Sequence, residues 1–200
     1  MPNWCNNYIV ILPNDNDKKL KKFSKLVERV KISINTKEPL FSSLLGTKTS
    51  KDVDWYSHNV NRWGTKWDVD ASEGEIDIVE DQITMNISTA WSPPNGFLTE
   101  LCQTYGVKAT IEFEEGGCDF AGIYEITPEG IVSQVDYDSV DEYNYFHNDC
   151  FWDNVISYAE DLDFEEVSLE DFINLYSFIT DDVGKRELTE VYENAKSFCE

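Results

Sequence analysis

Positive charge is what the second half of this 200-residue chain lacks. From Ala109 to Gly184 there is no lysine or arginine in 76 residues, whereas 21 aspartates and glutamates occur there. Before Trp67 there are 12 basic and 6 acidic residues; from Trp67 onward there are 4 basic and 33 acidic ones. The formal net charge of −23 far exceeds the roughly 2–8 units that keep a small domain soluble. This excess argues against direct binding to nucleic acid or to anionic membranes, because their charges would repel it.

Long apolar runs and paired cysteines are also missing. No stretch approaches the ~18 consecutive apolar residues of a membrane helix, and Met1 leads directly into Pro-Asn-Trp-Cys-Asn, so no secretory signal is expected. The five cysteines are odd in number and contain no C-x-x-C pair, which is typical of reduced thiols. We therefore expect a cytoplasmic protein without membrane contact.

Metal-binding and catalytic motifs are scarce. His58 and His147 are the only histidines, and neither lies near a Cys or carboxylate pattern with metal-site spacing. Asp136, Asp138 and Asp141 have the spacing of a calcium loop, but its sixth position is Asp141 instead of glycine and its twelfth is His147 instead of glutamate. No H-E-x-x-H or Walker-type loop occurs. We expect no metal and no cofactor, identify no catalytic residue, and favour a non-enzymatic role.

The hydrophobic periodicity predicts an α+β fold. Segments with the period of a strand and segments with the period of a helix follow one another in a β-α-β-β-α-β order. The strands are expected at 7–12, 75–80, 83–89 and 107–114, and the helices after Asn14 or Asp15 and after Pro93-Pro94, the second ending at Gly106. This order is the ferredoxin-like plan, an antiparallel sheet with two helices on one face.

Two further features complete the predicted first domain, residues 1–137. Segments 120–126 and 130–135 flank Thr127-Pro128-Glu129, so a β-hairpin is expected to extend the sheet. Residues 36–66 have the pattern of an irregular insert with short elements, including 40–41 and 55–63.

Beyond Tyr137 the period becomes helical. Ser139 and Ser168 each precede an acidic residue by three positions, a helix-start signal. Three apolar stripes then predict three amphipathic helices; their members are Trp152, Val155, Ile156 and Ala159, then Leu169, Phe172, Ile173 and Tyr176, then Leu188, Val191, Tyr192 and Ala195. We expect residues 138–200 to form an acidic helical extension packed on the first domain.

The predicted topology brings distant segments together. In a β-α-β-β-α-β sheet the first and second strands start at one end, here called the base, and the third and fourth strands finish there. Four stretches therefore meet at the base: residues 2–6, 63–68, 89–94 and 112–117. They contain four of the six tryptophans.

These stretches carry the motifs of a known family. P-N-W-C-x-N at 2–7, W-G-T-K-W-D at 63–68, T-A-W-S-P-P at 89–94 and E-x-G-x-x-F-x-G at 115–122 resemble, in this order, the YubB-type ferredoxin-like family of plasmid and phage proteins. The resemblance spans roughly residues 1–125. It implies a mobile-element origin and a ferredoxin-like fold, but no catalytic role, because the family is uncharacterised.

Two interpretations of the base stay open. In the structural one, the tryptophans close one end of the core and Asp68 and Asn3 cap backbone groups. In the functional one, the tryptophans form the wall of a ligand pocket into which polar groups project. The pocket residues would be Asn3, Trp4, Lys66, Trp67, Asp68, Trp91 and Glu114.

The acidic half could imitate nucleic acid. Duplex DNA carries one charge about every 1.7 Å, and acids at every third or fourth helical position give one charge per ~5 Å of helix, so two or three adjacent helices approach the duplex density. The carboxylates that would form this partner-binding surface are Asp136, Asp138, Asp141, Glu142, Asp149, Asp153, Glu160, Asp161, Asp163, Glu165, Glu166, Glu170 and Asp171. The alternative is that the source cytoplasm favours acidic proteins in general, or that solubility alone explains the acidic bias. The lysine-rich first helix argues against a general bias.

The sequence thus predicts a phage or plasmid accessory protein. It would bind the basic surface of a host or defence protein through its acidic half, without touching nucleic acid itself. The alternative is a small-ligand binding domain or enzyme that uses the tryptophan-lined base. The sequence does not fix the oligomeric state.

Overall fold

In the computed structural model of this chain, the described residues are 3–14, 17–46, 54–148, 150–164 and 166–199. The chain forms two compact units, Met1–Asp136 and Tyr137–Glu200. We call them the sheet unit and the helical unit and describe each by itself. The predicted packing of the helical extension on the first domain stays a prediction.

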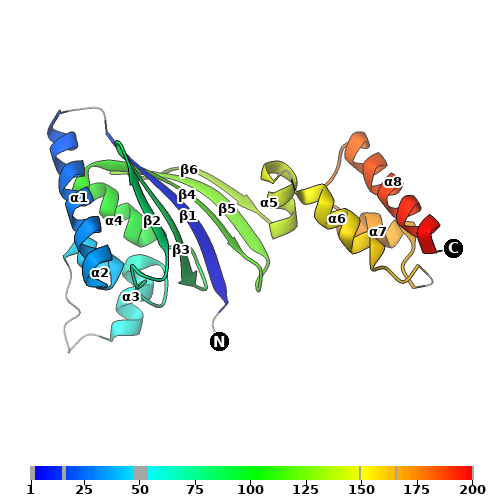
Figure 1. Cartoon of the computed structure of the whole chain (residues 1–200), viewed down its shortest axis with the longest axis horizontal. Coiled ribbons are helices and arrows are strands. Elements are labelled where there is room, and N and C mark those ends of the chain that lie inside the picture. The colour runs from blue at the N-terminus through cyan, green and yellow to red at the C-terminus, as the bar shows by residue number, and fades with distance from the viewer. Residues whose placement is uncertain (1–2, 15–16, 47–53, 149, 165, 200) are drawn as a thin grey trace. The chain divides into compact units, whose positions relative to one another are not determined.

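The sheet unit contains one six-stranded sheet in the order β2-β3-β1-β4-β5-β6 (Figure 1). Its strands are β1 (Trp4–Pro13), β2 (Glu75–Val79), β3 (Gln82–Ala90), β4 (Val107–Glu115), β5 (Phe120–Thr127) and β6 (Gly130–Tyr137). β1 pairs antiparallel with both β3 and β4, and β2 and β5 pair antiparallel with their neighbours β3 and β4. The ferredoxin-like sheet extended by a β-hairpin is therefore confirmed.

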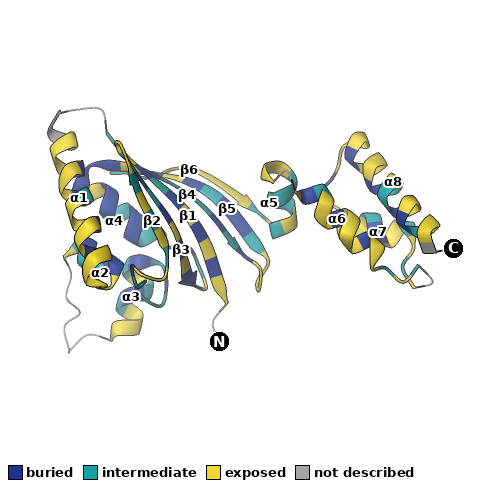
Figure 2. Cartoon of the chain, viewed as in Figure 1, coloured by how far each residue is buried: buried dark blue, intermediate teal, exposed yellow. Residues whose placement is uncertain are grey.

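Helices α1 (Asp17–Thr36) and α4 (Asn95–Tyr105) lie on the same face of this sheet (Figure 1). Along β1 buried and exposed residues alternate, as expected for a strand covered on one face (Figure 2). Phe23, Leu26 and Val30 of α1 are buried in the same core as Ile9 and Ile11 of β1. Fully burying one such side chain contributes about 1.5–3 kcal/mol to stability.

The boundaries of α4 follow the sequence signals. The helix begins directly after Pro94, whose fixed φ suits a helix start. It ends at Gly106, which adopts a left-handed φ of 64° and donates its N–H to the carbonyl of Cys102. Pro93-Pro94 and Gly106 thus set the length of the helix as predicted.

The predicted irregular insert contains two short helices, α2 (Leu40–Leu45) and α3 (Trp55–Trp63). Leu40, Phe41 and Leu44 of α2 are fully buried, and Trp63 at the end of α3 is buried beside Phe41 with its ring centroid 5.6 Å away. The insert therefore adds to the core of the sheet unit instead of lying outside it.

The helical unit consists of α5 (Val140–His147), α6 (Phe151–Glu160), α7 (Leu169–Leu175) and α8 (Asp182–Cys199). The three predicted apolar stripes correspond to α6, α7 and α8, and α5 follows the helix-start signal at Ser139. Ser139 and Ser168 cap α5 and α7 as their sequence signals predicted, and Ser168 forms a capping box with Asp171. The core of the helical unit is rich in aromatic side chains: Phe151, Phe172, Tyr176 and Tyr192 are buried together. Ile156, predicted in the apolar stripe of α6, is exposed instead.

Candidate functional site

The strand register brings three of the four sequence stretches together at the base of the sheet, and the hydrogen bond from Thr65 to the Ala90 carbonyl brings the fourth there. Trp4 at the start of β1 is paired with Ala90 at the end of β3. Asn6, two residues further along β1, is paired with Glu114 near the end of β4. The topology alone therefore located this end of the sheet correctly.

Five aromatic side chains and one lysine form a continuous series at the base, which we call the basal aromatic surface. Ring centroids lie 6.0 Å apart for Trp55 and Tyr56, and 6.2 Å apart for Tyr56 and Trp91. Nζ of Lys66 continues the series, at 4.6 Å from the Trp91 ring and 4.5 Å from the Trp67 ring. Trp67 is in turn 6.1 Å from Trp4. The members are Trp4, Trp55, Tyr56, Lys66, Trp67 and Trp91.

Four of these five rings are exposed to solvent, and Trp67 is half-buried. The exposed fraction is 50% for Trp4, 49% for Trp55, and 40% for both Tyr56 and Trp91. By contrast Trp63, which closes the core at the end of α3, is 2% exposed. Closing the core therefore does not account for most of the basal aromatic surface, and contiguous exposed apolar side chains are typical of binding surfaces.

The backbone beneath the rings is held by hydrogen bonds. The hydroxyl of Thr65 donates to the carbonyl of Ala90 at 2.9 Å, and the hydroxyl of Ser92 donates to the carbonyl of Gly64 at 2.5 Å. Trp91 has a left-handed φ of 75° and donates its N–H to the carbonyl of Asn3 at 3.0 Å. A non-glycine residue in this conformation costs roughly 1–2 kcal/mol, so the surrounding contacts stabilise an exposed Trp91 in a strained position.

The contact between α3 and α4 places Trp55 and Tyr56 beside the other rings. Gly96, near the start of α4, lies against the backbone of Arg62 so closely that a Cβ atom there would be 2.2 Å from the Arg62 carbonyl oxygen. The guanidinium of Arg62 also forms a bidentate ion pair with Glu100 of α4. Glycine at position 96 is thus required by packing, not by φ.

Asp68, which the functional interpretation placed in the ligand pocket, serves α2 instead. Its carboxylate accepts hydrogen bonds from the backbone N–H groups of Phe41 and Ser42, at 2.7 and 2.9 Å, and from the Ser42 hydroxyl at 2.7 Å. These bonds satisfy N–H groups that have no partner within the helix. For Asp68 the structural interpretation holds, because its oxygens are already committed to the protein.

Asn3 and Glu114 lie at the base but bond to the protein. Asn3 donates its amide to Sγ of Cys118 at 3.4 Å. Glu114 accepts a long hydrogen bond of 3.4 Å from the Asn6 amide. Of the predicted pocket residues, the structure brings Trp4, Lys66, Trp67 and Trp91 into one surface and places Asn3, Asp68 and Glu114 outside the ring series.

The buried carboxylate at the base is Glu115, which the sequence did not single out. Its side chain is 1% exposed and accepts the backbone N–H groups of Gly117 and Cys118 at 2.8 and 2.7 Å. Burial raises the pKa of Glu115, but these hydrogen bonds outweigh burial and hold the pKa below its ordinary value. Glu115 therefore organises the loop after β4.

Several of the predicted partner-binding carboxylates have local structural roles. Asp136, in the sheet unit, accepts hydrogen bonds from the hydroxyl of Tyr124 and from the amide of Gln134. Glu142 accepts the backbone N–H of Asp138 at 2.8 Å. Asp171 completes the capping box of α7, and hydrogen bonds from Ser168 lower its pKa.

Most of the predicted carboxylates of the helical unit are exposed. Asp149 and Glu165 lie outside the described residues. The exposed ones are Asp138, Asp141, Asp153, Glu160, Asp161, Asp163, Glu166, Glu170 and Asp171, and Glu142 is half-buried. Within the described part of the chain, no hydrogen bond or ion pair is formed by the side chains of five of them: Asp153, Glu160, Asp161, Glu166 and Glu170.

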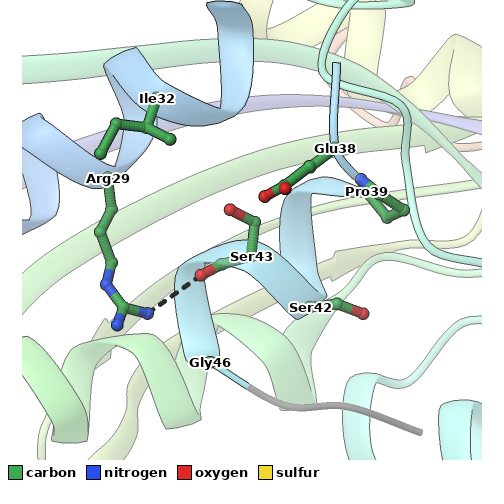
Figure 3. Close-up of a pocket in the computed structure, with 7 residues that line it drawn as sticks. All are labelled: Arg29, Ile32, Glu38, Pro39, Ser42, Ser43 and Gly46. Carbon is green, nitrogen blue, oxygen red and sulfur yellow. Dashed lines mark hydrogen bonds between the residues drawn. The ribbon is translucent and has the colours of Figure 1, made fainter. Parts of the chain in front are cut away.

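A pocket of about 520 Å³ lies between α1 and α2 in the sheet unit (Figure 3). Arg29 of α1 extends along it and donates to the carbonyls of Ser43 and Leu44, at 3.0 and 3.3 Å. A cation in this position stabilises the negative end of α2. Besides Arg29, the residues that line the pocket are Ile32, Glu38, Pro39, Ser42, Ser43 and Gly46. Of the two charged side chains that line the pocket, Arg29 and Glu38, the Arg29 guanidinium is thus committed to the fold.

The described residues contain neither a candidate metal site nor a membrane-spanning helix. No group of three or more potential metal-ligating side chains was found there, and none of the helices described is long and apolar enough to span a membrane. His147 shares a 2.6 Å hydrogen bond with the hydroxyl of Tyr137, while the His58 ring lies 6.1 Å from that of Trp63.

Comparison with known proteins supports the fold. Residues 62–151 match the family model described as a ferredoxin-like domain in Api92-like protein. The match spans β2 to β6, the helix α4 between them and α5, and it does not include β1 or α1. No curated protein and no solved structure gives a significant match to the chain. The sheet unit therefore contains a ferredoxin-like domain, by both topology and family model.

Proposed function

We propose that the chain is an accessory protein of a phage or plasmid that binds a basic surface of a host or defence protein, in the host cytoplasm, through its helical unit. The single observation that carries the proposal is the exposed carboxylate group Asp153, Glu160, Asp161, Glu166 and Glu170, which has no intramolecular partner among the described residues. The proposed phage or plasmid origin is supported by the resemblance of the motifs at the base to the YubB-type family.

The charge of the helical unit is unfavourable for the unit itself. Residues 137–200 contain 18 acidic and three basic residues. Glu160 and Asp161 stand at the C-terminal end of α6, where the helix dipole disfavours negative charge. A partner with lysine and arginine side chains would relieve both the repulsion and the unfavourable dipole, and the field would accelerate association.

The test uses the full chain and two variants with equal changes in charge. In the first, Asp153→Asn, Glu160→Gln, Asp161→Asn, Glu166→Gln and Glu170→Gln neutralise the helical unit. The control neutralises five exposed carboxylates of the sheet unit, Glu73, Glu75, Asp77, Glu80 and Asp81. Proteins captured from a bacterial lysate by the unaltered chain are then purified.

Association rates are measured with each purified partner. We expect the first variant to associate about tenfold or more slowly at low salt, with a weaker dependence on salt, and the control to change little. Equal losses in both variants would show that net charge, not the helical unit, attracts the partner. Competition by duplex DNA for the same partner would add nucleic-acid mimicry to the proposal, and its absence would remove mimicry alone.

A further inference from the structure

We infer that the basal aromatic surface is a second binding site, which takes arginine side chains from an extended segment of another protein. The site belongs to the sheet unit, so it does not depend on the carboxylates of the helical unit. The inference starts from four exposed rings, those of Trp4, Trp55, Tyr56 and Trp91, which are joined into one surface through Lys66 and Trp67.

The protein itself shows that these rings accept a cation. The ammonium group of Lys66 lies within 4.6 Å of the ring centroids of both Trp67 and Trp91, inside the ~6 Å range of cation–π attraction. Trp55, Tyr56 and Trp4 have no such cation among the described side chains, although each is at least 40% exposed. A ligand cation could therefore continue along the surface the arrangement that Lys66 begins.

The surrounding charge selects the sign of the ligand. Asp54 caps α3 directly before Trp55 and is exposed. Glu114 lies at the end of β4 and Asp119 in the loop after it, which the Asn3–Cys118 contact brings to the base. Lys66 is the one cation in the ring series, and its charge is already directed at two rings. The local potential therefore favours a cationic ligand, as does the composition of the sheet unit, where residues 1–136 contain 21 acidic and 13 basic residues.

Arginine fits better than the other candidates. Its planar guanidinium stacks on aromatic faces and is more weakly hydrated than the ammonium of lysine. Single-stranded nucleic acid also stacks on aromatic platforms, but it requires a positively charged groove along its backbone, and this surface is flanked by carboxylates. A proline-rich segment would use the rings without any dependence on charge.

Binding is measured by tryptophan fluorescence and calorimetry on the full chain. The probes are a synthetic Arg-Gly repeat peptide and the same peptide with citrulline, which keeps the shape and removes the charge. The chain that carries the five neutralised carboxylates of the helical unit serves as a second background, so that binding to that unit is separated from binding to the rings. We expect the citrulline peptide to bind about tenfold or more weakly in both backgrounds.

Three variants locate the site. Trp4→Ser with Trp55→Ser and Tyr56→Ser should weaken binding of the Arg-Gly peptide about tenfold or more, whereas Tyr158→Ser, an equally exposed aromatic in the helical unit, should leave it unchanged. Lys66→Met removes the competing intramolecular cation and should strengthen binding about threefold. Circular dichroism confirms that each variant is folded.

Equal affinity for the arginine and citrulline peptides would overturn the inference, as would unchanged binding by the triple variant. Tighter binding of an oligothymidine that is lost in Lys66→Met would assign the surface to nucleic acid instead. Preference for a proline-rich peptide would assign it to charge-independent recognition. None of these outcomes bears on the helical unit, whose test uses different variants.

Discussion

Asp68 holds the N-terminal end of α2 through Ser42, accepting both its backbone N–H and its hydroxyl on one carboxylate oxygen. The other oxygen accepts the N–H groups of Phe41 and Val69. We expect Asp68→Ala to lower the free energy of unfolding by about 2–3 kcal/mol, because it removes a helix cap and leaves partly buried N–H groups unsatisfied. Urea denaturation followed by fluorescence measures this loss. Asp77→Ala, an exposed change on β2, is the control, and an equal effect of the two would contradict the assignment.

Substitution of the two adjacent glutamates at the end of β4 should have very different effects on the stability of the protein. Glu115 is buried and bonded to the backbone of Gly117 and Cys118, whereas Glu114 makes one long contact. Glu115→Ala should destabilise the protein by about 2 kcal/mol, and Glu114→Ala by less than about 0.5 kcal/mol.

The stability difference at Glu115 should depend on pH in one direction. Hydrogen bonds to the ionised form hold its folded pKa below the ordinary 4.5, so the folded state favours the carboxylate. The stabilisation is complete above the unfolded pKa and disappears as the pH falls through the lowered folded pKa. Urea denaturation of the unaltered protein and of Glu115→Ala between pH 7 and pH 3 measures this difference in stability. A difference that grows on acidification would refute it.

The four cysteines whose side chains the structure describes should separate into two reactivity classes. Burial, and for Cys5 also the charge of Glu115, raises the pKa of Cys5 and of Cys102 to about 12, which leaves roughly one thiolate in 10⁴ at pH 8. Cys118 and Cys150 are exposed. We expect iodoacetamide to label the exposed pair in the folded protein, and the buried pair only on unfolding. Peptide mapping by mass spectrometry assigns each site. Rapid labelling of Cys5 in the folded state would contradict the buried environment.

The strands and main helices could be predicted because their signals are local. Alternation along β1, Pro93-Pro94 before α4, Gly106 after it and Ser168 before α7 each act within a few residues. The base could also be located, since the direction of each strand follows from their order. The insert was less predictable, because α2 is six residues long and depends on Asp68, 26 residues beyond Ser42, for its cap.

The composition of the candidate site was only half predictable. Trp4, Trp67 and Trp91 are marked by their place at strand ends, but Trp55 and Tyr56 join them through tertiary packing of α3 on α4. The signal that could have found them is the helix start at Asp54, which directly precedes two exposed aromatic residues. The roles of Asp68 and Glu114 could not be separated by sequence, since both are carboxylates beside the same end of the sheet.

The α3–α4 contact gives a prediction with a matched control. Gly96→Ala would place a methyl group 2.2 Å from the Arg62 carbonyl oxygen, whereas Gly116→Ala meets nothing within 4 Å. We expect Gly96→Ala to destabilise the protein by about 2–3 kcal/mol and to change the fluorescence of the basal tryptophans. Gly116→Ala should do neither. A stable Gly96→Ala protein with unchanged emission would mean that α3 is not fixed against α4.

The backbone contact at Gly96 also bears on how the rings would meet a ligand. When a loop becomes ordered on binding, its loss of conformational entropy reduces the affinity. Two helices in direct backbone contact instead keep a constant spacing. The five rings are therefore held at fixed distances from one another before a partner binds. The entropic penalty of association then falls on the incoming segment alone, and a change of ring chemistry could alter selectivity without rebuilding the scaffold.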